Sequence, residues 1–116
     1  MNQVTLVGRV VQDPELKEIR EGVSITRFNL AVDRYLGSAQ RNEKKSEGKV
    51  TADFPRIVVW GKQAQNCSKF LKKGSLISLQ GRVATSMYEN AHGDNVFVTE
   101  IVGEKVQFLN NLSLQN

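Results

Sequence analysis

Aromatic and basic side chains alternate along one stretch of the chain, in a pattern that suits binding to planar, charged ligands. In an extended strand, Phe54, Arg56 and Trp60 point to one face, while Ile57 and Val59 point to the other. Both faces would then carry large apolar side chains, although a strand whose second face only meets water has no need of Phe and Trp there. Nucleobases stack on aromatic rings whatever their identity, and a guanidinium can hold a phosphate or stack as a flat cation. The pattern therefore favours a surface for single-stranded nucleic acid.

Further aromatic and basic residues extend this pattern. Arg82 and Tyr88 lie on the polar face of a second expected strand, and Tyr35 begins a basic loop. Residues 34–50 carry a net charge of +3, and residues 62–73 carry four lysines and no acid, within a chain of net charge +4. A polyanionic partner is the functional interpretation of these two segments, and a solvated loop with an ordinary polar helix face is the alternative.

The aromatic residues also have structural interpretations. Phe54 and Trp60 could each lie in the core or in a subunit interface, whereas Tyr88, at the end of a strand before a turn, is expected to be exposed. The four other phenylalanines that fall on apolar faces are expected in the core: Phe28, Phe70, Phe97 and Phe108.

The elements that position these residues follow from hydrophobic periodicity. Alternation predicts strands over residues 4–11, 23–33, 54–60, 76–88 and 96–108, and residues 16–19 could continue the first strand after a bend. The spacing of Ala64, Cys67, Phe70 and Leu71 predicts a short helix over Lys62–Leu71, with Gly74 as its C-terminal cap. An all-β, five-stranded OB-fold barrel with one short helix between strands three and four has this order. We expect one domain over residues 1–109 and a short unstructured tail over residues 110–116.

The sequence lacks the residue sets that most enzyme classes use for catalysis or for binding a cofactor. The single His92 lies in an expected turn, Cys67 on the apolar helix face, and no phosphate-binding loop or zinc ligand set occurs. We therefore expect no catalytic residues, no cofactor and no metal. An OB-type nuclease is the enzymatic alternative, but the aspartates that it would need for a divalent ion are dispersed along the sequence: Asp13, Asp33, Asp53 and Asp94.

We expect no secretory signal, and the apolar runs of the sequence are too short to span a membrane. With a single cysteine it can form no disulfide within the chain. We expect a cytoplasmic, nucleoid-associated protein.

Six stretches of the sequence, taken in order, carry a resemblance to a known family. They are residues 1–10 (MNQVTLVGRV), 12–16 (QDPEL), 28–32 (FNLAV), 59–64 (VWGKQA), 70–75 (FLKKGS) and 100–102 (EIV). On these stretches the chain resembles the bacterial and phage single-stranded DNA-binding protein family over nearly its whole length. The resemblance implies an OB domain that assembles into a homo-oligomer, usually a homotetramer, and binds single-stranded DNA during replication, recombination and repair.

The resemblance also assigns roles to residues of this chain. It implies base stacking on aromatic side chains and phosphate contacts from basic ones. The implied DNA-binding residues are Tyr35, Phe54, Arg56, Trp60, Lys62, Lys73, Arg82 and Tyr88. Many family members also end in an acidic tip that recruits replication proteins. Residues 112–116 (LSLQN) contain no acid, so we assign no recruitment through such a tip.

Two binding alternatives stay open. The apolar outer face of residues 54–60 could be a subunit interface of an OB-fold assembly factor that acts mainly through protein contacts. RNA could also be the ligand, because stacking surfaces accept both polymers and no residue pattern here reads a 2′-hydroxyl.

Overall fold

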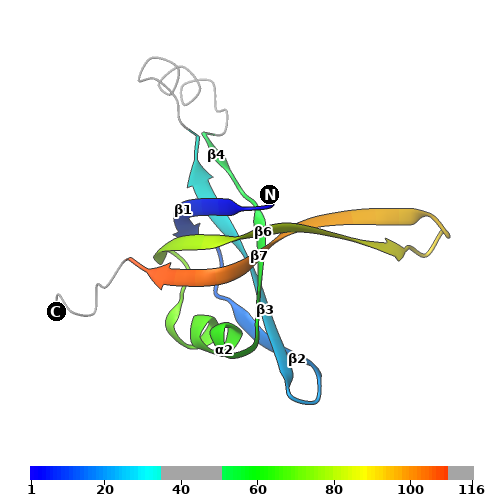
Figure 1. Ribbon diagram of the computed structural model, residues 1–116, viewed down its shortest axis with the longest axis horizontal. Coiled ribbons are helices and arrows are strands. Elements are labelled where there is room, and N and C mark those ends of the chain that lie inside the picture. Colours follow the sequence, from blue (N-terminus) through cyan, green and yellow to red (C-terminus); the bar gives the residue numbers. More distant parts are fainter. Residues whose placement is uncertain (35–50, 110–116) are drawn as a thin grey trace.

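The computed structural model describes residues 1–34 and 51–109, which form seven strands and one helix (Figure 1). In chain order the elements are β1 (Val4–Val10), β2 (Glu15–Arg20), β3 (Val23–Asp33), β4 (Ala52–Asp53), β5 (Arg56–Trp60), α2 (Gly61–Phe70), β6 (Leu76–Glu89) and β7 (Asn95–Phe108).

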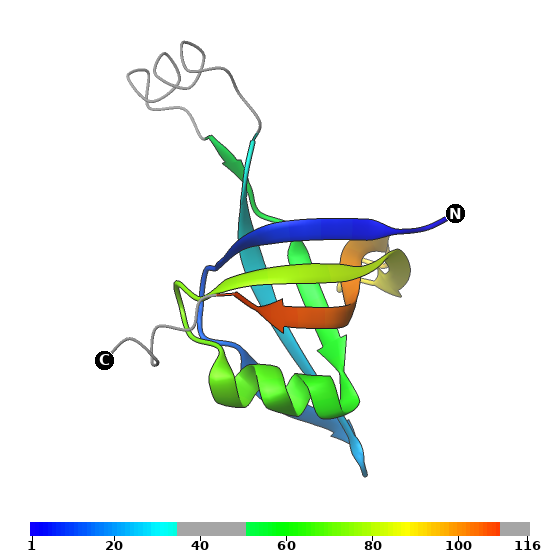
Figure 2. The same ribbon diagram turned by 60° about the vertical axis from the view of Figure 1, so that its left-hand side comes forward.

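Five strands form a sheet that closes on itself. Its order is β1-β6-β7-β5-β3, and β1 pairs with β3 as well as with β6. All these pairings are antiparallel except that of β5 with β7, where Ile57 lies beside Ile101 and Val59 beside Gly103. The helix lies along the lower side of the barrel in Figure 2, between β5 and β6. The all-β fold with five principal strands and one intervening helix, predicted from periodicity, is confirmed.

Two short strands extend this arrangement along β3. Residues 15–20 form a separate strand, β2, which pairs with β3 and does not continue β1. β4 pairs with the last residues of β3. Phe54 and Pro55 separate β4 from β5, so the strand predicted from Phe54 begins at Arg56. Pro55 has no N–H to give to a ladder, which accounts for the interruption.

The core follows the inner faces of the barrel strands and the inner face of α2. The largest fully buried side chains include Phe28, Leu30, Ile57 and Leu79, and α2 adds Ala64 and Cys67. Thr26 is also buried, and its hydroxyl donates to the carbonyl oxygen of Glu15 at 2.8 Å, so the buried polar group is paired.

Glycines allow close approach where strands cross. A Cβ at Gly8 would collide with the carbonyl oxygen of Ala31 on β3, at the point where β1 passes from β6 to β3. A Cβ at Gly81 would collide with the carbonyl oxygen of Val102, beside the register shift between β6 and β7. Both positions therefore exclude a side chain.

The helix spans Gly61–Phe70, one residue earlier at each end than predicted. Gly74 is not its cap, because Leu71 already has an extended backbone there. Gly74 instead has a φ of 95° in a turn closed by a hydrogen bond from the Ser75 N–H to the Lys72 carbonyl oxygen.

Three of the four phenylalanines expected in the core are exposed. Phe28 is buried, but Phe70, Phe97 and Phe108 are not. Phe97 is 74% exposed because β6 and β7 continue beyond the barrel as a two-stranded arm, residues 84–99, which projects to the right in Figure 1. Apolar and polar residues alternate along the arm as they do in the barrel. However, no second layer of the described structure covers the arm face that continues the inner face of the barrel.

Candidate single-stranded nucleic-acid interface

One outward surface of the barrel, here called the outer wall, is formed by neighbouring faces of β3, β5, β7 and β6. In register, Arg27 lies beside Val58, Val58 beside Val102, and Val102 beside Arg82. Asn29 lies beside Arg56 in the next row. Because side chains alternate across a strand, residues two apart share this face, which includes Arg56, Val58 and Trp60 of β5.

The two predicted stacking residues around β5 are exposed. Phe54 is 50% and Trp60 45% exposed, and the Arg56 side chain between them is exposed as well. Val58, which shares their face, is buried. The structure thus excludes a place for Phe54 and Trp60 inside the barrel of the single chain. Trp60 shares a strand face with Arg56, whereas Phe54 lies in the break before β5.

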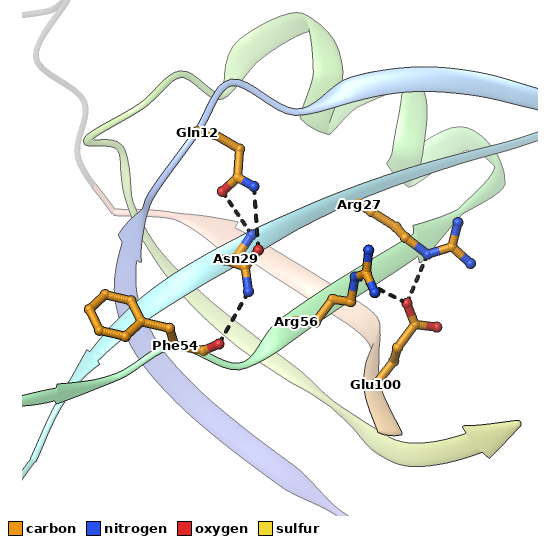
Figure 3. Close-up of polar contacts among 6 residues, drawn as sticks. All are labelled: Gln12, Arg27, Asn29, Phe54, Arg56 and Glu100. Atoms are coloured by element: carbon orange, nitrogen blue, oxygen red, sulfur yellow. Dashed lines mark hydrogen bonds and ion pairs between the residues drawn. The ribbon is translucent and has the colours of Figure 1, made fainter. Parts of the chain in front are cut away.

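Arg56 shares a carboxylate with a second arginine, as Figure 3 shows. The Oε2 of Glu100 lies 2.8 Å from the Nε of Arg27 and 3.7 Å from the Nε of Arg56. The Glu100 side chain is only 14% exposed, whereas the Arg27 and Arg56 side chains are 43% and 55% exposed. Two positive charges are therefore held beside one negative charge, which leaves the cluster with a net charge of +1.

A second set of hydrogen bonds holds the backbone near Phe54. The side chain of Gln12 accepts from the Asn29 N–H at 3.0 Å and donates to the Asn29 side-chain oxygen at 3.3 Å. The Nδ2 of Asn29 donates to the carbonyl oxygen of Phe54 at 3.1 Å, and the Leu30 N–H donates to that of Pro55. These bonds fix the main chain at the break before β5, while the Phe54 ring points away from Arg56 (Figure 3).

Arg82 and Tyr88 lie on β6, on the same strand face but at different distances from β5. Arg82 is in the row of Val58 and forms an ion pair with Glu104 at 3.3 Å. Tyr88 is exposed on the arm, opposite Val96 and close to the turn. The structure therefore brings Arg82 to the outer wall and places Tyr88 beyond it.

The two predicted lysines mark opposite ends of α2. Lys62 is exposed in the first turn, two residues after Trp60. Lys73 is exposed beyond the last turn, where its backbone N–H donates to the Oδ1 of Asp13 at 2.8 Å. Tyr35, the remaining predicted residue, lies outside the described residues.

Sequence reasoning missed the contribution of β3 and β7 to this surface. Arg27 and Asn29 alternate with the buried Thr26, Phe28 and Leu30, so the period that predicted the core could also have placed them outside. No local pattern could have joined Glu100 to them, because that contact depends on the pairing of β5 with β7. A pocket of about 210 Å³ adjoins the cluster and is lined by Glu15, Lys17, Ile25, Thr26, Arg27 and Arg56.

Within residues 1–34 and 51–109, no three His, Cys, Asp or Glu side chains gather where they could hold a metal ion. Burial raises the pKa of the Cys67 thiol from 9.0 to about 11, which keeps it protonated and a poor nucleophile at neutral pH.

Comparison with known proteins shows the family of this chain. The model of the single-strand binding protein family matches residues 1–109. The chain belongs to this family. The match covers all the strands and the helix described above.

Named relatives are similar over the same stretch. The chain is 50% identical over 109 residues to "Single-stranded DNA-binding protein 3" of Listeria innocua and 47% identical over 109 residues to "Single-stranded DNA-binding protein" of Halalkalibacterium halodurans. It is 45% identical over 109 residues to "Single-stranded DNA-binding protein 1" of Staphylococcus aureus. Each match covers 94% of this chain but only 64%, 61% and 65% of the respective relative, so the chain spans less than two thirds of their length.

The structure also bears on membrane association. Among the residues that it describes, no helix has the length and apolar character needed to cross a bilayer.

Proposed function

We propose that this chain binds single-stranded DNA without sequence preference and protects it during replication, recombination and repair. The observation that carries the proposal is the exposure of Trp60 and Arg56 on the outer wall and of Phe54 at the break just before β5. Rings on a solvent-facing sheet offer stacking surfaces to any base, and the arginine supplies charge for the backbone. The names of the similar proteins support this choice of ligand.

The remaining predicted residues would add further contacts to the DNA. Tyr88 would stack a base on the arm, Tyr35 would stack another, and Lys62, Lys73 and Arg82 would neutralise phosphates. We also propose that the chain works as a homo-oligomer, specifically a tetramer, in the cytoplasm at the nucleoid. Family membership supports the assembly.

Fluorescence of the single tryptophan tests the stacking role directly. Titration with dT oligomers should quench Trp60 emission, with a saturation point that reports the number of nucleotides bound per protomer. Quenching should weaken as salt rises, because phosphate neutralisation releases counterions. Binding seen by oligonucleotide anisotropy without any change in Trp60 emission would remove Trp60 from the interface.

A substitution at Phe54 tests the same surface independently. Phe54→Ala should weaken binding by about 1–3 kcal/mol, the usual value of one base stacked on one ring. The measurement is a titration at constant salt, accompanied by sedimentation to show that the assembly is unchanged. A variant that loses its assembly but keeps its affinity would identify the outer wall as a subunit interface.

A further inference from the structure

A pair of exposed aromatic rings lies away from the outer wall, at the C-terminal end of α2. Phe70 is 57% exposed and Phe108, at the end of β7, is 40% exposed. Their ring centroids are 6.3 Å apart with an interplanar angle of 55°, so they form a tilted pair that remains open to solvent. We call these two residues the helix-end pair. Large rings in this position add little to the core and are available to a ligand.

The helix-end pair lies in the most basic part of the described chain. The Nζ of Lys69 is 5.4 Å from the centroid of the Phe70 ring, and the exposed Lys72 and Lys73 follow after the buried Leu71. Residues 61–74 contain no acid. The Asp13 carboxylate reaches this segment by accepting from the backbone N–H of Lys73, which leaves the ammonium group of that lysine out of the bond.

The outer face of α2 connects the helix-end pair to the outer wall. Lys62, Asn66 and Lys69 are exposed at spacings of four and three residues, which places them on one face of the helix. Trp60 directly precedes the helix, and Phe70 is its last residue. A ten-residue helix rises about 15 Å, so an aromatic ring stands at each end of a short basic track. Figure 2 shows the helix along one side of the barrel.

We propose that the helix-end pair is a second nucleobase-stacking site, in which Phe70 and Phe108 receive a base while Lys69 and Lys72 hold the adjoining phosphates. The strand would reach it by leaving the outer wall past Trp60 and following the outer face of α2. The proposal rests on the proposed function and extends it by a site that the outer wall does not include.

Charge favours single-stranded DNA over a second copy of the chain as the occupant. In a two-fold contact between identical chains the same surface meets itself, so the lysines of residues 62–73 would face lysines. Like charges that meet across an interface cost free energy, whereas a phosphate backbone complements them.

A tryptophan moved to the helix-end pair tests the proposal. Trp60→Phe removes the only native tryptophan, and Phe70→Trp in that background leaves a single reporter at position 70. Binding of dT oligomers of increasing length is followed by anisotropy of a labelled oligonucleotide and by tryptophan emission. We expect oligomers that just saturate quenching of Trp60 in the wild-type protein to leave the reporter at 70 unchanged, and longer ones to quench it.

The outcomes separate this inference from the proposed function. Quenching of Trp60 in the wild type, with no response of the reporter at 70 to any length that binds, would overturn the second site alone. Failure to quench Trp60 and failure to bind would overturn the proposed function. A reporter whose emission changes with protein concentration in the absence of DNA would assign the helix-end pair to contacts between copies and overturn the second site.

Affinity measurements give a second readout. Phe70→Ala should lower affinity for long oligomers about 5- to 150-fold and change affinity for short oligomers by less than about twofold. Phe97→Ala, the same change at an exposed ring on the arm, is the matched control and should not show this length dependence. Lys69→Ala with Lys72→Ala should reduce the log–log salt slope by about 1.4 for long oligomers, because each phosphate contact contributes about 0.7. Equal losses for short and long oligomers would contradict the proposal.

Discussion

At the scale of single residues, whether an aromatic side chain is buried depends on whether a second layer covers its strand face. Its hydrophobicity alone does not decide this. Phe28 and Phe97 both lie on the inward face of an alternating strand, yet one is buried and the other is 74% exposed. Phe28 lies inside the closed barrel, whereas Phe97 lies on the arm, where the inner face has no opposing layer.

This difference predicts unequal stability effects. Phe28→Ala should lower the free energy of unfolding by about 3–5 kcal/mol, since it removes a buried ring and leaves a cavity. Phe97→Ala should change it by less than about 0.5 kcal/mol, as expected for a surface position. Urea unfolding at low protein concentration measures both. A large loss for Phe97→Ala would show that an assembly buries this ring.

The buried thiol gives a pH-dependent prediction. In the unfolded chain Cys67 has a pKa near 9.0, while burial in the fold raises its pKa to about 11. Between pH 9 and 11 the unfolded chain therefore binds fewer protons than the native one, so the free energy of unfolding falls as pH rises. Cys67→Ala should unfold with a shallower decline over this range, as measured by denaturant titration at several pH values. Parallel curves for the two proteins would contradict this assignment.

Residue types and their alternation along the strand predicted part of the candidate site. Period-two alternation placed Phe54, Arg56 and Trp60 outside, and the structure agrees. It could not reveal that Glu100 lies between Arg27 and Arg56, because those three residues meet only through pairing of distant strands. It also could not distinguish a covered inner face from an uncovered one, which is why Phe97 was misplaced.

At the scale of elements, the barrel depends on glycines at strand crossings. Gly81→Ala should be severely destabilising, because its Cβ would collide with the backbone of Val102, which cannot move without disturbing the ladder. Gly103→Ala should cost less, because its Cβ would lie 3.1 Å from a side-chain atom of Leu79 and 3.2 Å from one of Val59, which can shift.

Thermal unfolding of the two variants measures the order. We expect Gly81→Ala to lose more than about 3 kcal/mol and Gly103→Ala about 1–2 kcal/mol, in the usual range for added methyl groups in packed sites. The reverse order would show that the β6–β7 register shift relaxes more readily than the side chains beneath it.

Element types were predictable where the period was strong. The strands over residues 23–33, 76–88 and 96–108 and the helix in residues 61–70 follow from periods of two and 3.6. The separate strand β2 and the true position of Gly74 were not predictable in this way. Both depend on partners elsewhere in the fold. β2 depends on its pairing with β3, and Gly74 lies in a turn where its own N–H donates a hydrogen bond to the Val10 carbonyl oxygen.

At the scale of the whole molecule, binding to a polyanion should depend on where a charge lies as well as on the net charge of +4. Lys73→Ala should lower the log–log salt slope of oligonucleotide binding by about 0.7, the value for one phosphate on a single strand. Lys105→Ala removes the same charge from an exposed position on β7 to which no phosphate contact is assigned, and it should change the slope much less. Titrations at four salt concentrations compare them. Equal changes would indicate a diffuse electrostatic effect with no contact at Lys73.

The topology has a consequence for how the chain is made. Val4 is paired with Gly81, and the parallel contact of β5 with β7 needs residues 101–103. During synthesis, the first half of the molecule therefore leaves the ribosome with the edges of β1 and β5 unpaired. Closure must wait until nearly the last described residue has emerged, and pairing across such sequence separations is slow. Exposed strand edges in the nascent chain are where protection by chaperones would matter most.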